Sequence, residues 1–339
     1  MNDRFLRACR REQVDVTPVW FMRQAGRYMA EYRTLREKHS LLDLCRHPEL
    51  AAEVTLQPVN RLDVDAAILF SDLLLPLDPM GISFDFVEGE GPIIHNPLRS
   101  ATDIAKLRDF DSRDDLGYVL DTIHLLRREL EGRVPLVGFA GAPFTLASYA
   151  IEGGPSRNYE NTKALMYGEP KTWHRLCESF VSVISSYLSA QVEAGAQALQ
   201  IFDSWIGALG PSDYREFALP HSQQILRAAS STGVPVIHFG TGTATLLELM
   251  AEAGGDVIGV DWRIPLDDAW KRIGDNHAIQ GNLDPTLLLG PTERFSDGIT
   301  DILRRADKRP GHIFNLGHGI LPGTPVENVK MAVHLVHSY

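Results

Sequence analysis

Two arginines lie close together near the start of the chain, within the stretch MRQAGRY at residues 22–28. A guanidinium is a planar fork of hydrogen-bond donors that matches carboxylates and phosphates. Because Arg23 and Arg27 follow an apolar run, they could together bind a polyanion at the end of a strand. Two surface arginines on an ordinary helix would have the same spacing, so this alternative stays open.

A single carboxylate, Asp72, lies inside the apolar stretch FSDLLLP at residues 70–76. A buried charge without partners is costly, so such a group needs hydrogen-bond donors or a raised pKa. Asp72 is therefore a candidate acceptor for N–H groups of a ligand, or a candidate general acid or base. A helix N-cap just beyond a strand is the competing interpretation.

Three further polar side chains could contact a ligand. The hydroxyls of Tyr149 and Ser204 could donate to an anion, and His318 lies between two glycines, where the backbone leaves room for a ligand. The competing interpretations are a core tyrosine, a capping serine and a histidine in a tight turn. No GxSxG motif surrounds Ser204, which argues against a serine nucleophile. No HExxH motif or other close set of His, Glu and Cys predicts a metal site.

The strands that must position these candidate residues are predicted by short apolar runs. Eight such runs are typical of buried parallel strands, and they span residues 18–22, 66–71, 135–140, 198–202, 235–239, 256–260, 278–281 and 312–316. Most are followed by an amphipathic helical pattern. The series predicts an α/β fold, a (β/α)8 barrel of the TIM type, with a doubly wound open sheet as the alternative. In a barrel the active site lies at the carboxyl ends of the strands.

The pattern indicates one domain over residues 1–339, because no linker, low-complexity tract or internal repeat interrupts it. Residues 82–97 differ from the rest of the chain, since apolar and polar residues alternate on both sides of a Gly-Glu-Gly sequence. This alternation predicts a β-hairpin inserted after the second strand.

Charge and composition restrict the partners. The net charge of −11 argues against a nucleic acid, although residues 1–50 are locally basic, with 10 Lys and Arg against 7 Asp and Glu. The longest apolar runs are far shorter than the roughly 20 residues of a membrane span, and the charged N-terminus does not resemble a secretion signal. Three scattered cysteines without a CxxC motif indicate a reduced, soluble, cytoplasmic protein.

Two stretches resemble the signatures of a known family, the uroporphyrinogen decarboxylases. They are PVWFMRQAGR at residues 18–27 and GFAGAPFTLASY at residues 138–149, the latter running on to Glu152 and Gly153. Residues 70–72, 259–263, 281–285 and 315–319 are similar to further family segments, so that the resemblance spans nearly the whole chain. It implies a (β/α)8 domain, a homodimer, and no metal or organic cofactor. It also implies decarboxylation of the four acetate side chains of uroporphyrinogen III to give coproporphyrinogen III in haem biosynthesis.

The resemblance also implies roles for the candidate residues. Arg23 and Arg27 would bind substrate carboxylates, and with Asp72 they form the expected catalytic set. Asp72 would accept the pyrrole N–H groups. The other expected substrate-binding residues are Gln24, Ala25, Gly26, Tyr149, Ser204 and His318, of which the last three would bind peripheral carboxylates or orient the ring. The family pattern assigns no proton donor, and arginine is a poor acid.

Two alternatives come from other classes of protein. A related barrel family uses zinc to transfer methyl groups and needs a His-x-Cys pair with a later Cys. Here the comparable residues 238–240 read HFG, and no cysteine follows Cys177. A non-catalytic carrier of tetrapyrroles or other polyanions would keep Arg23 and Arg27 but would not need Asp72.

Overall fold

The computed structural model describes residues 3–87 and 91–339. A curled sheet of seven parallel strands has the order β1-β4-β5-β6-β7-β8-β9. The strands are β1 (Ala67–Ile68), β4 (Leu136–Gly141), β5 (Ala198–Asp203), β6 (Val236–Gly240), β7 (Val257–Gly259), β8 (Ala278–Gln280) and β9 (His312–Ile313). Sequential parallel pairing with helical crossovers is the topology of the predicted α/β barrel, which is confirmed in this respect.

The first predicted strand, residues 18–22, closes the ring in a shortened form. Val19 pairs in parallel with Phe314 just beyond β9. On the other side, the Asp65 N–H donates to the Val19 carbonyl at 2.8 Å. The Val19 N–H, however, donates to the Asp65 Oδ2 atom at 2.7 Å and not to a backbone carbonyl. A side chain thus takes the place of one ladder bond, and the segment is too irregular to count as a full strand.

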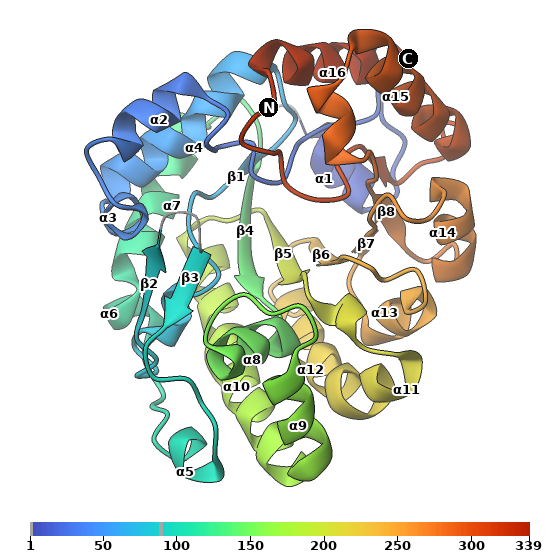
Figure 1. Ribbon diagram of the computed structural model, residues 1–339. Coiled ribbons are helices and arrows are strands. Elements are labelled where there is room, and N and C mark those ends of the chain that lie inside the picture. The colour runs from blue at the N-terminus through green and yellow to red at the C-terminus, as the bar shows by residue number, and fades with distance from the viewer. Residues whose placement is uncertain (1–2, 88–90) are drawn as a thin grey trace.

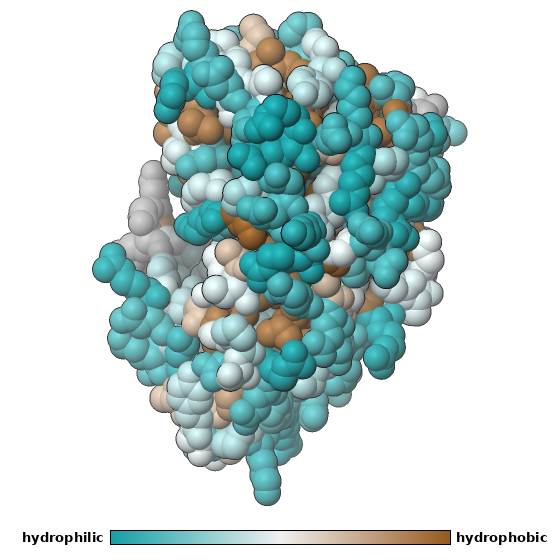
Figure 2. Space-filling view, turned by 90° about the vertical axis from the view of Figure 1, so that its right-hand side faces the viewer, coloured by the Kyte–Doolittle hydropathy of each residue, from teal (hydrophilic) through white to brown (hydrophobic). Residues whose placement is uncertain are grey.

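A layer of helices surrounds the sheet (Figure 1). This layer includes α4 (Pro48–Leu62), α7 (Gly117–Glu129), α10 (Pro170–Ala194), α12 (Leu219–Ser230), α13 (Leu247–Ala253), α14 (Leu266–Ile273), α15 (Thr292–Ala306) and α16 (Val326–Ser338). Proline at the first position of α10 and a left-handed glycine, Gly195, after its last residue mark the ends of this helix. Figure 2 shows mainly hydrophilic residues on one face of this layer, with small separate hydrophobic patches.

Further helical elements lie in the connections. They are α1 (Arg4–Cys9), α2 (Ala30–Arg36), α3 (Leu41–Arg46), η1 (Leu75–Leu77), α5 (Ala101–Ile104), α6 (Ser112–Asp115), α8 (Pro143–Glu152), α9 (Glu160–Gly168), η2 (Ile206–Ala208), α11 (Pro211–Asp213), the π-helical η3 (Tyr214–Ala218) and η4 (Pro285–Leu289). None of the described helices is both long and apolar enough to cross a bilayer.

The predicted hairpin lies between β1 and β4 in the chain. Its strands β2 (Phe84–Val87) and β3 (Gly91–Ile94) pair antiparallel. The predicted Gly-Glu-Gly turn lies partly outside the described residues. The hairpin contacts the C-terminal end of α8, because the Ile94 N–H donates to the carbonyl of Gly153, the residue that follows this helix, at 2.7 Å. Phe86, Gly91 and Pro92 of the hairpin line a cavity together with residues that follow β1, β4 and β5, which places the hairpin beside the carboxyl ends of the barrel strands.

A buried chain of hydrogen bonds crosses the barrel interior. The Trp20 indole N–H donates to Gln280 Oε1 at 3.0 Å, and Gln280 Nε2 donates to Gln200 Oε1 at 3.0 Å. All three side chains are almost completely buried. Since a buried polar group needs its partner, this chain fixes the segment around Trp20 in register with β5 and β8.

Candidate active site

All but one of the predicted site residues line one cavity of about 480 Å³ at the carboxyl end of the barrel. They are Arg23, Ala25, Gly26, Arg27, Asp72, Tyr149, Ser204 and His318. These residues follow the segment around Val19 and strands β1, β4, β5 and β9, which lie far apart in the sequence. The barrel brings them together because the carboxyl ends of its parallel strands meet at the same end.

Gln24 is the exception, since it does not line the cavity. Its buried side chain accepts from the Phe21 N–H at 3.0 Å and donates to the Ala66 carbonyl at 3.0 Å. The Tyr28 hydroxyl in turn donates to the Gln24 carbonyl at 2.7 Å. Gln24 therefore fastens the arginine-bearing loop to the start of β1, and any contribution to binding acts through that loop.

Arg23 has a left-handed backbone, with φ of 59°, which is uncommon outside glycine. Two glycines leave room for it. A Cβ atom on Gly26 would lie 2.9 Å from the Arg23 carbonyl oxygen, and one on Gly319 would lie 2.6 Å from Arg23 Cγ. Strained backbone of this kind persists only where its surroundings hold it in place. Neither Arg23 nor Arg27 forms an ion pair within residues 3–87 and 91–339, so both guanidiniums are available to an anion.

The first and last segments of the barrel hold each other in place beside Arg23. The Met22 N–H donates to Asn315 Oδ1 at 3.2 Å, and the Ile320 N–H donates to the Met22 carbonyl at 2.9 Å. These bonds fix the positions of Arg23 and His318 relative to each other. The two residues therefore present their side chains to the cavity from adjacent loops.

Asp72 caps a turn and also lines the cavity, while its role toward a ligand stays a prediction. Its Oδ1 atom accepts from the Leu74 N–H at 2.9 Å and so caps the turn that leads into η1. The carboxyl group also lines the cavity. Burial raises the pKa of Asp72 to about 6, and the Leu74 N–H and the Arg23 charge only partly oppose this shift. At pH 7 most of the group is ionised, in surroundings where its charge acts strongly.

His318 is a neutral hydrogen-bond donor. The Gly319 N–H donates to its Nδ1 atom at 2.7 Å, so the proton of a neutral imidazole is on Nε2. Burial lowers the pKa of His318 to about 4, and the charges of Arg23 and Arg263 act in the same direction. At neutral pH this side chain can therefore donate one hydrogen bond to a carboxylate but adds no charge.

Tyr149 and Ser204 complete the polar side of the cavity. Tyr149 packs against Trp205, with ring centroids 3.8 Å apart. Burial and the nearby Asp72 charge raise the pKa of Tyr149, so its hydroxyl stays protonated and can donate. The Ser204 carbonyl accepts from the Thr241 hydroxyl at 2.5 Å, which fixes the loop after β5.

Sequence reasoning missed the aromatic wall of the cavity, which consists of Phe70, Phe86, Phe139, Phe202, Trp205 and Phe239. Phe202 packs edge-on against Phe139 and Phe239, with centroid distances of 5.5 and 5.9 Å. These three rings come from the neighbouring strands β4, β5 and β6. One phenylalanine near the end of each of three successive strands was the available signal. The wall suits a large unsaturated ligand whose charges lie at its edge.

Comparisons with known proteins agree with this arrangement. The family model "Uroporphyrinogen decarboxylase (URO-D)" matches residues 1–339. Among curated proteins, a uroporphyrinogen decarboxylase of Sorangium cellulosum is 60% identical over 338 residues, covering 100% of this chain and 97% of the relative. One of Carboxydothermus hydrogenoformans is 57% identical, covering 99% and 96%.

Solved structures show the same fold at low identity. A methyltransferase from Methanosarcina mazei aligns with a TM-score of 0.79 at 22% identity, covering 99% of this chain and 98% of that one. A putative vitamin-B12-independent methionine synthase from Listeria monocytogenes aligns with a TM-score of 0.60 at 11% identity, covering 96% of each chain. Fold and site thus define a TIM-type barrel enzyme with a cavity at the carboxyl ends of its strands, lined by two arginines, a carboxylate and aromatic rings. Within that class, the chain belongs to the uroporphyrinogen decarboxylase family.

The fold alone does not separate this family from the methyltransferases. In the part of the chain that the structure describes, no three His, Cys, Asp or Glu side chains are grouped to hold a metal ion. The three cysteines, Cys9, Cys45 and Cys177, are free and buried in different places. It is the full-length family match that assigns the activity to the carboxy-lyases and not to the methyltransferases.

Proposed function

We propose that this protein removes carbon dioxide from the four acetate side chains of uroporphyrinogen III and so produces coproporphyrinogen III. The observation that carries this proposal is the position of Asp72. It is one carboxylate in a largely aromatic cavity, with Arg23 and Arg27 on the adjacent loop. Such a cavity matches a ring of pyrroles with N–H groups at its centre and carboxylates around its edge.

The substrate itself supplies the electron sink for the reaction. A proton adds to the pyrrole carbon next to the acetate-bearing carbon and makes the ring a cation. The carbon–carboxylate bond then breaks, and its electron pair neutralises the ring as carbon dioxide leaves. A proton adds to the exocyclic carbon to give the methyl group, and the ring proton is released. In balance, one carboxylate and one proton become carbon dioxide and a methyl C–H bond.

Each site residue has a defined part in this sequence. The Asp72 carboxylate accepts hydrogen bonds from the pyrrole N–H groups and stabilises the positive charge that develops on the ring. Arg23 and Arg27 hold peripheral carboxylates and thereby orient the ring. The neutral His318 and the protonated Tyr149 donate hydrogen bonds to further carboxylates without adding charge.

An anaerobic incubation with uroporphyrinogen III, in the presence of a chelator, tests the activity directly. After oxidation, the products are separated by their number of carboxylates. We expect porphyrins with seven, six, five and four carboxylates to appear in turn. An unchanged eight-carboxylate peak from folded protein contradicts the proposal, and tight binding in that case supports the carrier function instead.

The activity is expected to increase with pH around pH 6. Burial raises the pKa of Asp72 to about 6, and only the carboxylate form stabilises the ring cation. The rate should therefore fall as the pH drops below 6, whereas His318, with a pKa of about 4, stays neutral throughout. Measuring kcat/KM between pH 5 and 8 checks this, because kcat/KM reports pKa values of the protein without bound substrate, and a flat profile through pH 6 contradicts the expectation.

The assembly, domain and location predictions belong to the same proposal. A homodimer and a single domain over residues 1–339 are supported by the family resemblance, and the closure of the barrel by Val19 on Phe314 also supports one domain. A cytoplasmic location is consistent with three free cysteines. Sedimentation at micromolar concentration should show a dimer, and a monomer alone contradicts this part of the proposal.

A further inference from the structure

Arg263 is a cation at the rim of the barrel that does not line the cavity. It follows β7, at the same end of the barrel as the site. The buried Asp261 carboxylate accepts from Arg263 Nη1 at 2.5 Å, from the Arg263 N–H at 3.0 Å and from the Gly242 N–H at 2.6 Å. The guanidinium also lies over the Trp262 ring, 4.2 Å from its centre. These contacts hold one edge of the guanidinium, and the side chain remains 52% exposed.

The loop that carries Arg263 contacts the loop that carries His318. A Cβ atom on Gly317 would lie 2.7 Å from the Trp262 nitrogen and 2.9 Å from Asp261 Cα, so the two backbones are in direct contact. The Asn282 side chain donates to the Asp261 carbonyl at 2.9 Å and fastens the same loop to the end of β8. Arg263 is also near enough to His318 for its charge to help lower the pKa of that imidazole.

We infer that Arg263 binds a peripheral carboxylate of the substrate, above the cavity and beside His318. This inference rests on the proposed function, because it needs a ligand with more carboxylates than Arg23 and Arg27 can pair. Asp261 engages Nη1, which leaves the Nη2 and Nε edge without a partner among the described residues. Since Asp261 and Trp262 already hold the guanidinium, little conformational entropy is lost when a carboxylate binds.

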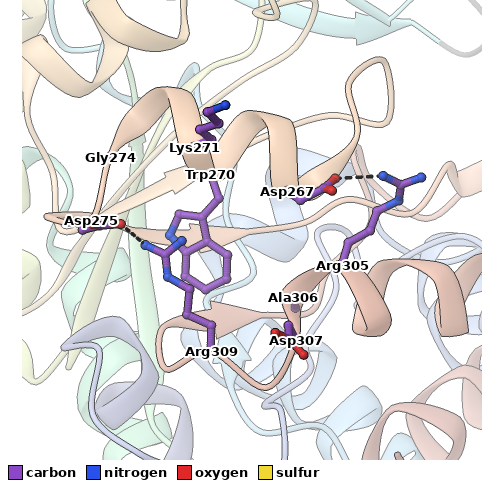
Figure 3. Close-up of a pocket in the computed structure, with 9 residues that line it drawn as sticks. All are labelled: Asp267, Trp270, Lys271, Gly274, Asp275, Arg305, Ala306, Asp307 and Arg309. Atoms are coloured by element: carbon purple, nitrogen blue, oxygen red, sulfur yellow. Dashed lines mark hydrogen bonds and ion pairs between the residues drawn. The ribbon is translucent and has the colours of Figure 1, made fainter.

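The chain contains a matched control for this arginine. Arg309 lies over Trp270 at 4.2 Å and pairs with Asp275 at 2.5 Å, so it makes the same two kinds of contact as Arg263, although Asp275 is exposed and Asp261 is buried. Figure 3 shows these side chains in a pocket between α14 and α15. Arg309 and Asp275 precede β9 and β8, so this pocket lies at the amino end of the barrel strands, opposite the site.

The test compares R263Q, R263K and R309Q in the decarboxylation assay. We expect R263Q to raise KM about fivefold with kcat within about twofold of wild type, and R263K to give a smaller increase. R309Q should change neither constant. The KM difference between R263Q and wild type should shrink at high ionic strength, because salt screens an exposed ion pair. Thermal unfolding of each variant shows whether it is folded.

Several results would overturn the inference. They are an unchanged KM in R263Q, an equal KM increase in R309Q, and a KM increase that persists at high salt, which indicates a displaced loop. If R263Q does not fold, the KM of R263K decides whether Arg263 binds the substrate, because lysine keeps the charge but not the planar fork of the guanidinium. A wild-type protein that fails to convert the substrate contradicts the proposed function itself, which is a different outcome.

Discussion

Replacing Asp72 by asparagine should lower kcat by about three orders of magnitude and change KM by no more than about threefold. The carboxylate interacts with a charge that exists on the pyrrole ring only as the reaction proceeds, so its loss affects the transition state most. Asparagine keeps an oxygen that can accept from the Leu74 N–H, and the turn should therefore survive. Steady-state kinetics with uroporphyrinogen III measure both constants.

Asp78→Asn is the control for this variant. Asp78 is six residues further along the same segment and forms an exposed ion pair with Arg46 at 2.9 Å, so its loss should leave kcat unchanged. D72N should also be at least as stable as wild type at pH 7. Because the folded state raises the pKa of Asp72, the ionised group lowers stability as the pH rises through about 6, and asparagine removes this effect. A kcat within tenfold of wild type would rule out the proposed role.

Replacing Arg23 by glutamine should lower kcat/KM by about a hundredfold, mainly through KM. Arg23 lines the cavity, and its guanidinium has no ion-pair partner among the described residues, so a substrate carboxylate can use both of its edges. Glutamine keeps one donor but loses the charge and the planar fork. Kinetics and equilibrium binding of the substrate give two independent measures.

Two further variants separate the loss of charge from other causes. Arg11 also has a left-handed backbone, with φ of 59°, but it lies outside the cavity and donates to the Asp275 carbonyl. Arg11→Gln should therefore leave the kinetics unchanged. Gly319→Ala keeps the Arg23 charge but forces the side chain aside, and we expect a loss of activity between wild type and R23Q. If R23Q stays within threefold of wild type, Arg23 does not bind the substrate.

Much of the candidate site could be predicted, because residues that follow the strands of a barrel meet at its carboxyl end. Arg23, Asp72 and His318 lie at such ends, and they line one cavity although they are far apart in the sequence. Gln24 shows the limit of a contiguous motif. The stretch containing it predicts a loop that binds an anion, but it does not show which side chain turns inward to hold the loop. That depends on Ala66, which is 42 residues away.

The fold was predictable for a similar reason, and its exceptions have physical causes. Short apolar runs identified the strands, since parallel strands in a barrel are covered on both faces. The run at residues 18–22 gave only one bridge, because the Asp65 side chain takes the Val19 N–H. The sequence around Val19 does not reveal that a side chain 46 residues away accepts the hydrogen bond of its N–H group. The aromatic wall was missed because a phenylalanine at the end of a strand is also an ordinary core residue.

The contacts between residues 18–22 and residues 314–320 have a consequence for how this protein folds during its synthesis on the ribosome. Met22 meets Asn315 only after 293 further residues have been made, which takes roughly 15 to 60 seconds of translation. During that interval Val19 and Trp20 lack the partners that later bury them, and Arg23 has no Gly319 beside it. The nascent chain is thus inactive until its final strand has emerged from the ribosome. Its exposed apolar first segment must be protected from aggregation for almost the entire time of synthesis.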